Sequence, residues 1–590
     1  MAAAAVLPPT SRRLIYRPHQ QRFIENEVLH RSSPGRIVDH ELGSGKTLEV
    51  IGAIEALRRF PEFQDAPVLV LTMKALVDGF YSELHKSLSF QPSTRVDLYQ
   101  VTTTQRFYLH PDEFKYEGGI LVVDEAHMLR NPKSKRYRVI FQAAKKVQKT
   151  YLMSGTITIN YSVDAAPLFN LILSDEKRLK FKEAEAQNAK KVTEAKKYGL
   201  EETCYFGYLP VTRTDWDKAF LSGAVNPYLR CLVSHHAENH DSPEYKSHFP
   251  QVHRYAVKVS MTEAHYAAYK KEAADEEPHK KRPKMFKRQL DADMAFSAQD
   301  IRNFQERIRR GPQLSDTKDV RFLAWIMRLR MACNQLRGAD GVEYLPKIAH
   351  STLRIIEQHK ANPHYKATLT TTFIARGIRL AQRLLAKAGI KFVTITGQTS
   401  DVKDEHDIQR YVRAYNSGEV RVMLFSAAGQ HGLDLHGTTD SFILNPHWNV
   451  GLHRQAEARV IRYDSHKDSP VAAVNVFYYT TIFPLDRSGR DVSFLPRTAD
   501  EFLFELGIKK EEENQRLTSM LPTHCMEASG RDFVARTMPL FKKRHHHIQP
   551  QQLKRKSESE SESSVWHVSG VSGESGGVPK RRRIPKRARG

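Results

Sequence analysis

Two stretches of the chain share one pattern of hydrophobic and polar positions. In residues 15–175, short apolar runs such as Val68–Leu71 and Ile120–Val123 alternate with longer segments of helical spacing, and residues 321–482 repeat this alternation. Uninterrupted apolar runs are typical of strands that are buried on both faces of a parallel sheet. The pattern therefore predicts an α/β protein with two parallel-sheet lobes in tandem.

The stretch between these lobes, residues 176–320, follows a different pattern. Residues 183–197 are rich in Ala, Glu and Lys at helical spacing, which predicts a helical protrusion. The basic segments 279–284 and 307–310 follow. Such charged sequence fits either an insert that contacts DNA or a solvated linker. We expect a helical and charged insertion here.

The two ends of the chain differ from its body. Residues 1–14 predict a disordered start, and residues 483–545 form a C-terminal extension to the second lobe. Residues 546–590 hold two basic clusters around a Ser, Glu and Gly-rich segment, which cannot bury enough apolar surface to fold alone. Such clusters are typical of nuclear-import signals, which implies an import receptor and a nuclear location, or of a nucleic-acid-binding arm.

Composition narrows the class of protein. No apolar stretch approaches the roughly 18 residues that span a bilayer, so a membrane partner is not expected. The four cysteines, Cys204, Cys231, Cys333 and Cys525, form no close pair, which argues against a disulfide framework or a zinc-finger site. The adjacent pair His235 and His236 is expected in a surface loop.

The chain carries a formal net charge of +24. Residues 551–590 contribute +6 of this, which leaves +18 in the body. Lys and Arg side chains that neutralise phosphates give a sequence-independent affinity for nucleic acid. The excess therefore predicts a nucleic-acid partner, and the alternative is that the lysines only solvate the surface.

A glycine-rich turn lies near the start of the first lobe, at His40-Glu41-Leu42-Gly43-Ser44-Gly45-Lys46-Thr47. Such a turn lets backbone N–H groups approach phosphates, while a lysine reaches the outer phosphates and a hydroxyl binds Mg²⁺. Gly43, Ser44, Gly45, Lys46 and Thr47 fit these roles. His40 stands where the usual pattern has glycine.

Two carboxylates follow the apolar run 120–123. Asp124 and Glu125 are placed at the carboxyl edge of the predicted sheet, where ligands bind in parallel α/β folds. Asp124 is expected to hold the Mg²⁺ ion, and Glu125 to orient or deprotonate the attacking water. The alternative is that Glu125 is only a carboxylate at the start of a helix.

The second lobe supplies the other half of an ATP site. Arg459 and Arg462 are three positions apart, on one helical face, and suit stabilisation of charge on the transferring phosphoryl group. A phosphate cradle on one lobe and paired arginines on the other describe a site that closes between two domains.

These blocks resemble the motor of superfamily II helicases, and within it the Swi/Snf-type translocases of double-stranded DNA. The resemblance runs from about Tyr16 to about Tyr479. It rests on Arg17-Pro18-His19-Gln20, on Asp124-Glu125-Ala126-His127 with the later Asn131 and Ser134, on Ser154-Gly155-Thr156, on Gly429–Asp434, on Asn445-Pro446-His447-Trp448-Asn449 and on Gln455, Arg459 and Arg462.

The resemblance implies two RecA-like lobes that bind ATP and Mg²⁺. It implies that Gln20 reads the adenine and that Ser154, Gly155 and Thr156 couple the ATP site to nucleic acid. Gly432, Asp434 and Gln455 would join the ATP site from the second lobe. The chain departs from the family at Asp434, and at Tyr463-Asp464 where Ile-Gly is usual.

We therefore expect an ATP-dependent motor that moves on double-stranded DNA. The alternatives are a strand-separating DNA or RNA helicase, and a nucleic-acid-binding scaffold that keeps the fold without turnover. No accessory domain is recognisable, which is typical of a viral or selfish-element ATPase and would make the virion or the host nucleus its location.

Overall fold

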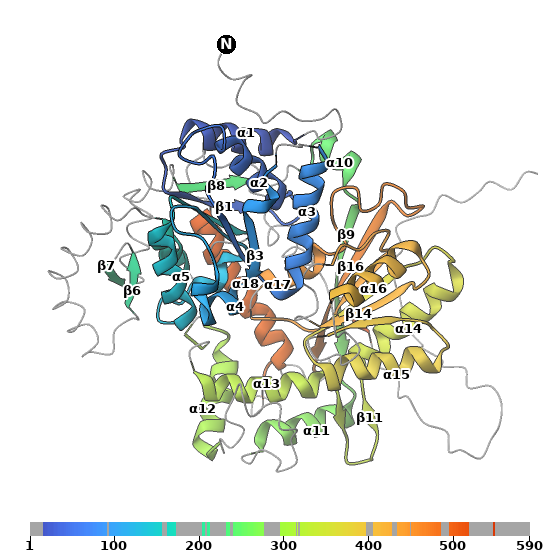
Figure 1. Cartoon of the computed structure of the whole chain (residues 1–590). Helices are drawn as coiled ribbons and strands as arrows, with labels where there is room; N and C mark the ends of the chain where they lie inside the picture. Colours follow the sequence, from blue (N-terminus) through green and yellow to red (C-terminus); the bar gives the residue numbers. More distant parts are fainter. Residues whose placement is uncertain are drawn as a thin grey trace, which may run out of the picture.

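The computed structural model describes residues 16–518 and 547–548, with gaps inside the first range. The gaps are residues 91–93, 156–161, 173–202, 207–208, 213–231, 237–239, 276–295, 314, 317–318, 397–404, 427–432, 449 and 485–494. Two parallel sheets, each covered by helices, make up most of the described chain, as Figure 1 shows. The predicted pair of α/β lobes is thereby confirmed.

The first lobe is built on a six-stranded parallel sheet with the order β3-β2-β4-β5-β1-β8. Its strands are β1 (Gly35–His40), β2 (Val68–Thr72), β3 (Tyr99–Thr103), β4 (Ile120–Val123), β5 (Lys149–Ser154) and β8 (Val233–His236). Its helices are α1 (Pro18–Leu29), α2 (Lys46–Leu57), α3 (Val77–Phe90), α4 (Thr104–Leu109), α5 (Lys135–Lys146) and α6 (Ala166–Ile172). Short 3₁₀ turns are η2 (Lys74–Leu76), η3 (Val96–Leu98), η4 (Pro111–Glu113), η5 (Ala126–Leu129) and η6 (Ser162–Ala165).

The apolar strands are buried because both faces of this sheet are covered. Leu121 and Val123 of β4 belong to a core with α5 and α6, whereas Ile120 and Val122 belong to a core with α1 and α2. Successive strand residues point to opposite faces, so an unbroken apolar run fills both cores at once. This is the physical reason why β4 ends where the carboxylates begin.

The second lobe has a seven-stranded parallel sheet with the order β13-β14-β12-β15-β16-β9-β17. Its strands are β9 (Gln251–Ser260), β12 (Ala367–Thr371), β13 (Val393–Ile395), β14 (Val422–Ser426), β15 (Asp440–Ile443), β16 (Ala473–Ile482) and β17 (His547–Ile548). Its helices are α14 (Pro346–Ala361), the π-helical η9 (Ile374–Ile378), α15 (Arg379–Lys387), α16 (Glu405–Ser417) and α17 (Gly451–Glu457).

A helical layer with its own core joins the end of the insertion to the C-terminal extension. It consists of α11 (Glu263–Ala274), α12 (Ala298–Arg310), α13 (Val320–Asn334) and α18 (Ala499–Thr518). Trp325 and Phe502 are fully buried in it. Helix α18 also lies against β16 and against η6 of the first lobe. The remaining elements are α10 (Pro243–His248), the hairpin β6 (Thr203–Phe206) with β7 (Leu209–Thr212), and the hairpin β10 (Leu336–Arg337) with β11 (Glu343–Tyr344).

The stretch predicted as an insertion also adds one strand to each sheet. Strand β8 pairs with β1 of the first lobe, and β9 pairs with β16 of the second. The expectation that His235 and His236 lie in a surface loop was wrong, because both belong to β8 and His236 is buried. The protrusion 183–197 and the basic segment 279–284 lie outside the described residues.

The arginines of 307–310 lie on α12 and have acidic partners. Arg307 pairs with Asp319, Arg309 with Glu306 and Arg310 with Asp316. Of the C-terminal residues 546–590, only the two of β17 are described. Within the described parts of the chain, no helix is both long and apolar enough to cross a membrane.

Candidate ATP site between the two lobes

The glycine-rich turn joins β1 to α2 in a backbone conformation that requires glycine. Gly43 has a φ of 88° and Gly45 a φ of 87°, both in the left-handed region that side chains disfavour. Gly45 precedes the first residue of α2, so the loop ends at a helix N-terminus with its unpaired N–H groups. The turn therefore has the backbone shape of a phosphate cradle.

Lys46 begins α2 and is held by its own loop. Its Nζ donates to the carbonyl oxygens of His40 (2.7 Å) and Glu41 (3.2 Å). Burial lowers the pKa of Lys46, against the opposing charges of Glu125, Glu49 and Asp124. The lysine thus lies within electrostatic reach of the acids after β4, although 78 residues separate Lys46 from Asp124 in the numbering.

Gln20 is buried against the phosphate loop. Its Nε2 donates to the carbonyl oxygens of Ser44 (3.2 Å) and Gly45 (3.3 Å), and its Oε1 accepts from the backbone N–H of Arg17 at 3.0 Å. A Cβ atom on Gly45 would collide with the Gln20 amide. The residue expected to read adenine therefore also shapes the loop in this structure.

The two carboxylates after β4 have different surroundings. Asp124 accepts from the Thr72 hydroxyl at 3.0 Å, and burial together with the neighbouring Glu125 raises its pKa. Burial would also raise the pKa of Glu125, but the hydrogen bond and charge of His127, with Lys46 and Arg459, lower it overall. Glu125 has a φ of 49°, an uncommon backbone conformation outside glycine.

His127 links Glu125 to the segment expected to couple the site to nucleic acid. Its Nδ1 lies 3.2 Å from the Oε2 of Glu125 and 3.3 Å from the Oγ of Ser154. Gly155 is packed closely, since an added Cβ would lie 2.9 Å from the Cγ of Leu42 in the phosphate loop. Thr156 lies outside the described residues.

The arginines of the second lobe face this site. Arg459 is buried, and its Nε donates to the carbonyl oxygen of Gln455 at 3.1 Å. Burial and the nearby Arg462 lower the pKa of Arg459 to about 9, while Glu125, Asp434 and Asp124 oppose this shift. The charges of Glu125 and Arg459 thus act on each other across the two lobes.

Asp434 and Arg462 form the rim of the same region. The Nη1 of Arg462 lies 3.7 Å from the Oδ1 of Asp434, and Arg462 also donates to the carbonyl oxygen of Ala458 at 2.8 Å. Gln455 is buried on α17. Gly432, expected beside Asp434, lies outside the described residues.

The described residues fit a nucleotide with Mg²⁺. The Oγ of Ser44 is buried in the loop and has no hydrogen-bond partner within the described structure, and the loop glycines leave its backbone open to an anion. Lys46 and the loop would hold the phosphates, and Thr47 and Asp124 the ion. When bound, Mg²⁺ neutralises charge on the outer phosphates.

The sequence patterns did not identify a second contact between the lobes. The guanidinium of Arg17, just before α1, lies 5.0 Å from the ring centroid of Tyr463 and 6.0 Å from that of Phe249. Asp464 has a φ of 56°, and its Oδ1 lies 2.7 Å from the Nδ1 of His248. A left-handed φ at Asp464 explains why the resembled family has glycine there. The departures at 463–464 thus make new contacts.

Comparison with known proteins gives matches for both halves of this arrangement. Residues 112–337 match the SNF2-related domain, and residues 349–464 match the helicase conserved C-terminal domain. A protein of Acanthamoeba polyphaga mimivirus named "Putative ATP-dependent RNA helicase L538" is 24% identical over 508 residues, which cover 85% of this chain and 95% of the relative.

Two further similarities are more limited. A "Termination factor NPH-I homolog" of African swine fever virus is 29% identical over 145 residues, 24% of this chain and 20% of the relative. The solved SWI2/SNF2 ATPase core of Sulfolobus solfataricus in complex with dsDNA is 16% identical, with a TM-score of 0.32, over 81% of this chain and 90% of that one. On the two matched domains and the viral relatives, the chain is an SNF2-related, helicase-like ATPase of superfamily II, whose ATP hydrolysis depends on nucleic acid.

Proposed function

We propose that this ATPase moves along double-stranded DNA without separating its strands. The SNF2-related match over residues 112–337 carries the proposal, because it contains the acids after β4, His127 and Ser154 in one family-typical block. The formal charge of +24 supports a polyanionic partner. Phosphate contacts carry no sequence information, which suits movement along DNA of any sequence.

In the proposed cycle, the site works only when the lobes approach each other. Lys46 and the phosphate loop bind the triphosphate, and Glu125 orients the attacking water and draws its proton. Arg459, whose charge already acts on Glu125, stabilises negative charge on the transferring group. The hydrogen-bond link from Glu125 through His127 to Ser154 supplies a physical route from hydrolysis to the DNA-contacting side.

A strand-separating helicase is the second candidate function. The mimivirus relative, which matches 85% of this chain, bears the name of an ATP-dependent RNA helicase. ATP turnover measured with duplex DNA, single-stranded DNA and RNA separates the two candidates. Strongest stimulation by duplex DNA supports the translocase, and strongest stimulation by RNA or a single strand contradicts it.

We further propose that the basic clusters of residues 551–590 direct the protein to the nucleus through an import receptor. The observation is their composition alone, with a net charge of +6 over the segment. Clustered Lys and Arg in sequence that cannot fold alone are accessible to a receptor. If the protein is viral, as its relatives are, this would be the nucleus of the host.

A further inference from the structure

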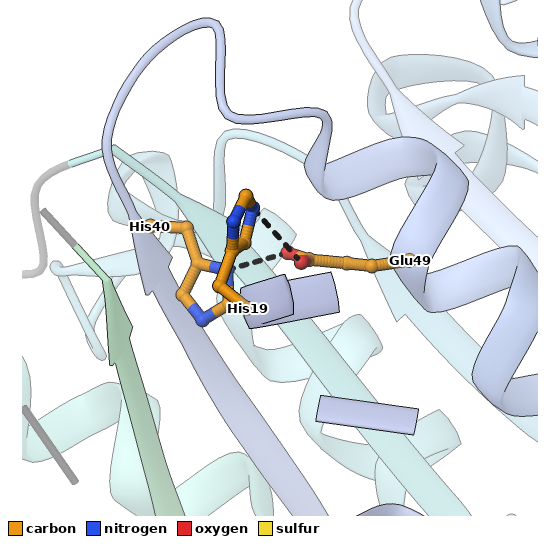
Figure 2. A group of neighbouring side chains, drawn as sticks. All are labelled: His19, His40 and Glu49. Carbon is orange, nitrogen blue, oxygen red and sulfur yellow. Dashed lines mark ion pairs between the residues drawn. The ribbon is translucent and has the colours of Figure 1, made fainter. Parts of the chain in front are cut away.

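Three ionisable side chains from three different elements meet behind the phosphate loop. They are His19 of α1, His40 at the end of β1 and Glu49 in the first turns of α2, and Figure 2 shows both imidazoles directed at the carboxylate. The Nδ1 of His40 lies 2.6 Å from the Oε1 of Glu49, and the Nε2 of His19 lies 3.9 Å from its Oε2. One nitrogen or oxygen atom of each residue lies within 4.8 Å of the others.

The charges of this cluster are poorly balanced. Glu49 has no exposed surface, and in the described structure neither of its oxygens has a hydrogen bond of good geometry. Burial lowers the pKa of His19 to about 3 and that of His40 well below its usual value, so both rings are neutral near pH 7. Burial raises the pKa of Glu49 to about 7. An ionised carboxylate in such a place requires a cation or a proton.

We propose that His19, His40 and Glu49 bind one divalent transition-metal ion of the Zn²⁺ type. Two neutral imidazoles and one carboxylate are a ligand set that Zn²⁺ accepts, with a further position left for water. Mg²⁺ prefers an all-oxygen shell, so this site is distinct from the one that accompanies ATP. The inference does not depend on what the motor moves along.

Neighbouring groups orient the ligands. The Nε2 of His40 lies 2.8 Å from the Oγ of Ser234, which leaves Nδ1 directed at Glu49. The ring of His19 stacks on that of His236 with a centroid distance of 3.8 Å and an interplanar angle of 6°. Partners of this kind fix ring orientation and tautomer in metal sites.

One existing hydrogen bond would change on metal binding. The Nε2 of His19 lies 3.0 Å from the carbonyl oxygen of Ser44, so in the metal-free protein it donates its proton there. Coordination through Nε2 replaces that bond. The ion would then tie α1, β1 and α2 together around the phosphate loop, and its role would be structural.

The test uses the full-length protein without nucleotide, in excess Mg²⁺, after treatment with a chelator. His545→Ala, His546→Ala and His547→Ala are introduced first, so that this histidine run does not bind metal. Co²⁺ serves as the spectroscopic probe and Zn²⁺ as its competitor. We expect one Co²⁺ per chain, with visible ligand-field absorption that one equivalent of Zn²⁺ abolishes.

Matched variants locate the ion. Glu49→Gln and His40→Gln should each weaken Co²⁺ binding at least about tenfold, while His265→Gln, a buried histidine of the second lobe, should not. Unchanged binding in Glu49→Gln, or no stoichiometric binding by the parent, would overturn the proposal. If the variants misfold by circular dichroism, zinc-edge X-ray absorption of the parent decides. Two imidazoles with oxygen support the site, and sulfur ligation refutes it.

Discussion

The Nδ1 of His127 lies 3.3 Å from the Oγ of Ser154, so the acid-bearing turn after β4 is connected to the end of β5. The same nitrogen lies 3.2 Å from the carboxylate of Glu125. A histidine placed between the hydrolytic acid and the segment expected to contact nucleic acid can transmit a change from one to the other. Physical coupling of this kind is open to direct test.

Ser154→Ala should uncouple hydrolysis from nucleic acid. We expect basal turnover to persist and stimulation by nucleic acid to fall about 2- to 30-fold, the range that corresponds to a coupling of roughly 0.5–2 kcal/mol. Phosphate release with and without saturating duplex DNA measures this. The control is Ser417→Ala, a serine at the end of α16 in the other lobe. Unchanged stimulation in Ser154→Ala would exclude the proposed route.

Turnover should depend on both lobes. Lys46→Ala should abolish hydrolysis, and Glu125→Gln should bind ATP without turning it over. Arg459→Ala should lower kcat by a factor on the order of 10³ if it stabilises the transferring group. A fluorescent ATP analogue measures binding, and phosphate release measures turnover. Exposed Lys74→Ala is the control, and near-normal hydrolysis by Lys46→Ala would sink the assignment.

Much of the site could be predicted because its chemistry lies in contiguous blocks. The turn 43–47 and the pair Asp124 and Glu125 follow apolar strands, and a parallel sheet brings the carboxyl ends of its strands to one edge. The structure bears out the two lobes and brings Lys46, Glu125 and Arg459 within electrostatic reach of one another. Their chemical roles remain predictions.

Other features depend on contacts between residues far apart in the chain. Strand β8 is only four residues long and has no periodic sequence around it, so its pairing with β1 could not be read from a pattern. The contact of Arg17 with Tyr463, and the meeting of His19 with Glu49, arise only after the sheets assemble. A single histidine or arginine in a sequence carries no sign of such a partner.

Glu501 in the first turn of α18 should make stability depend on pH. Burial raises its pKa to about 7, against the hydrogen bonds from Thr498 and the charge of Lys258. Since the pKa in the unfolded chain is near the ordinary 4.5, the folded protein binds the extra proton between these values, and its stability falls as pH rises from about 4.5 to about 7.

Glu501→Gln should therefore raise the Tm at pH 8 and leave it nearly unchanged at pH 4.5. Glutamine keeps an oxygen that can accept from the backbone N–H of Thr498, as Glu501 does at 2.9 Å. Differential scanning calorimetry at both pH values provides the measurement. Exposed Glu512→Gln on the same helix should shift the Tm equally at both. A destabilised Glu501→Gln at pH 8 would show that the charge is needed there.

Removal of residues 551–590 should abolish nuclear accumulation and leave ATP turnover largely intact. The segment carries a net charge of +6 but none of the site residues. Fluorescence microscopy of the tagged full-length and shortened proteins tests the import role. Persistent nuclear accumulation would refute it. A large loss of duplex affinity would instead favour a nucleic-acid-binding arm, as would a shallower dependence of log affinity on log salt, which changes by roughly 0.9 per phosphate contact.

The most direct test of the central proposal compares triplex displacement with strand release on matched substrates. One substrate carries a third strand on an intact duplex, and the other is a tailed duplex with an annealed strand. A motor that tracks an intact duplex displaces the third strand in the presence of ATP and leaves the annealed strand in place, and Glu125→Gln does neither. We predict this result. Efficient release of the annealed strand without triplex displacement would contradict the translocase account and establish a helicase.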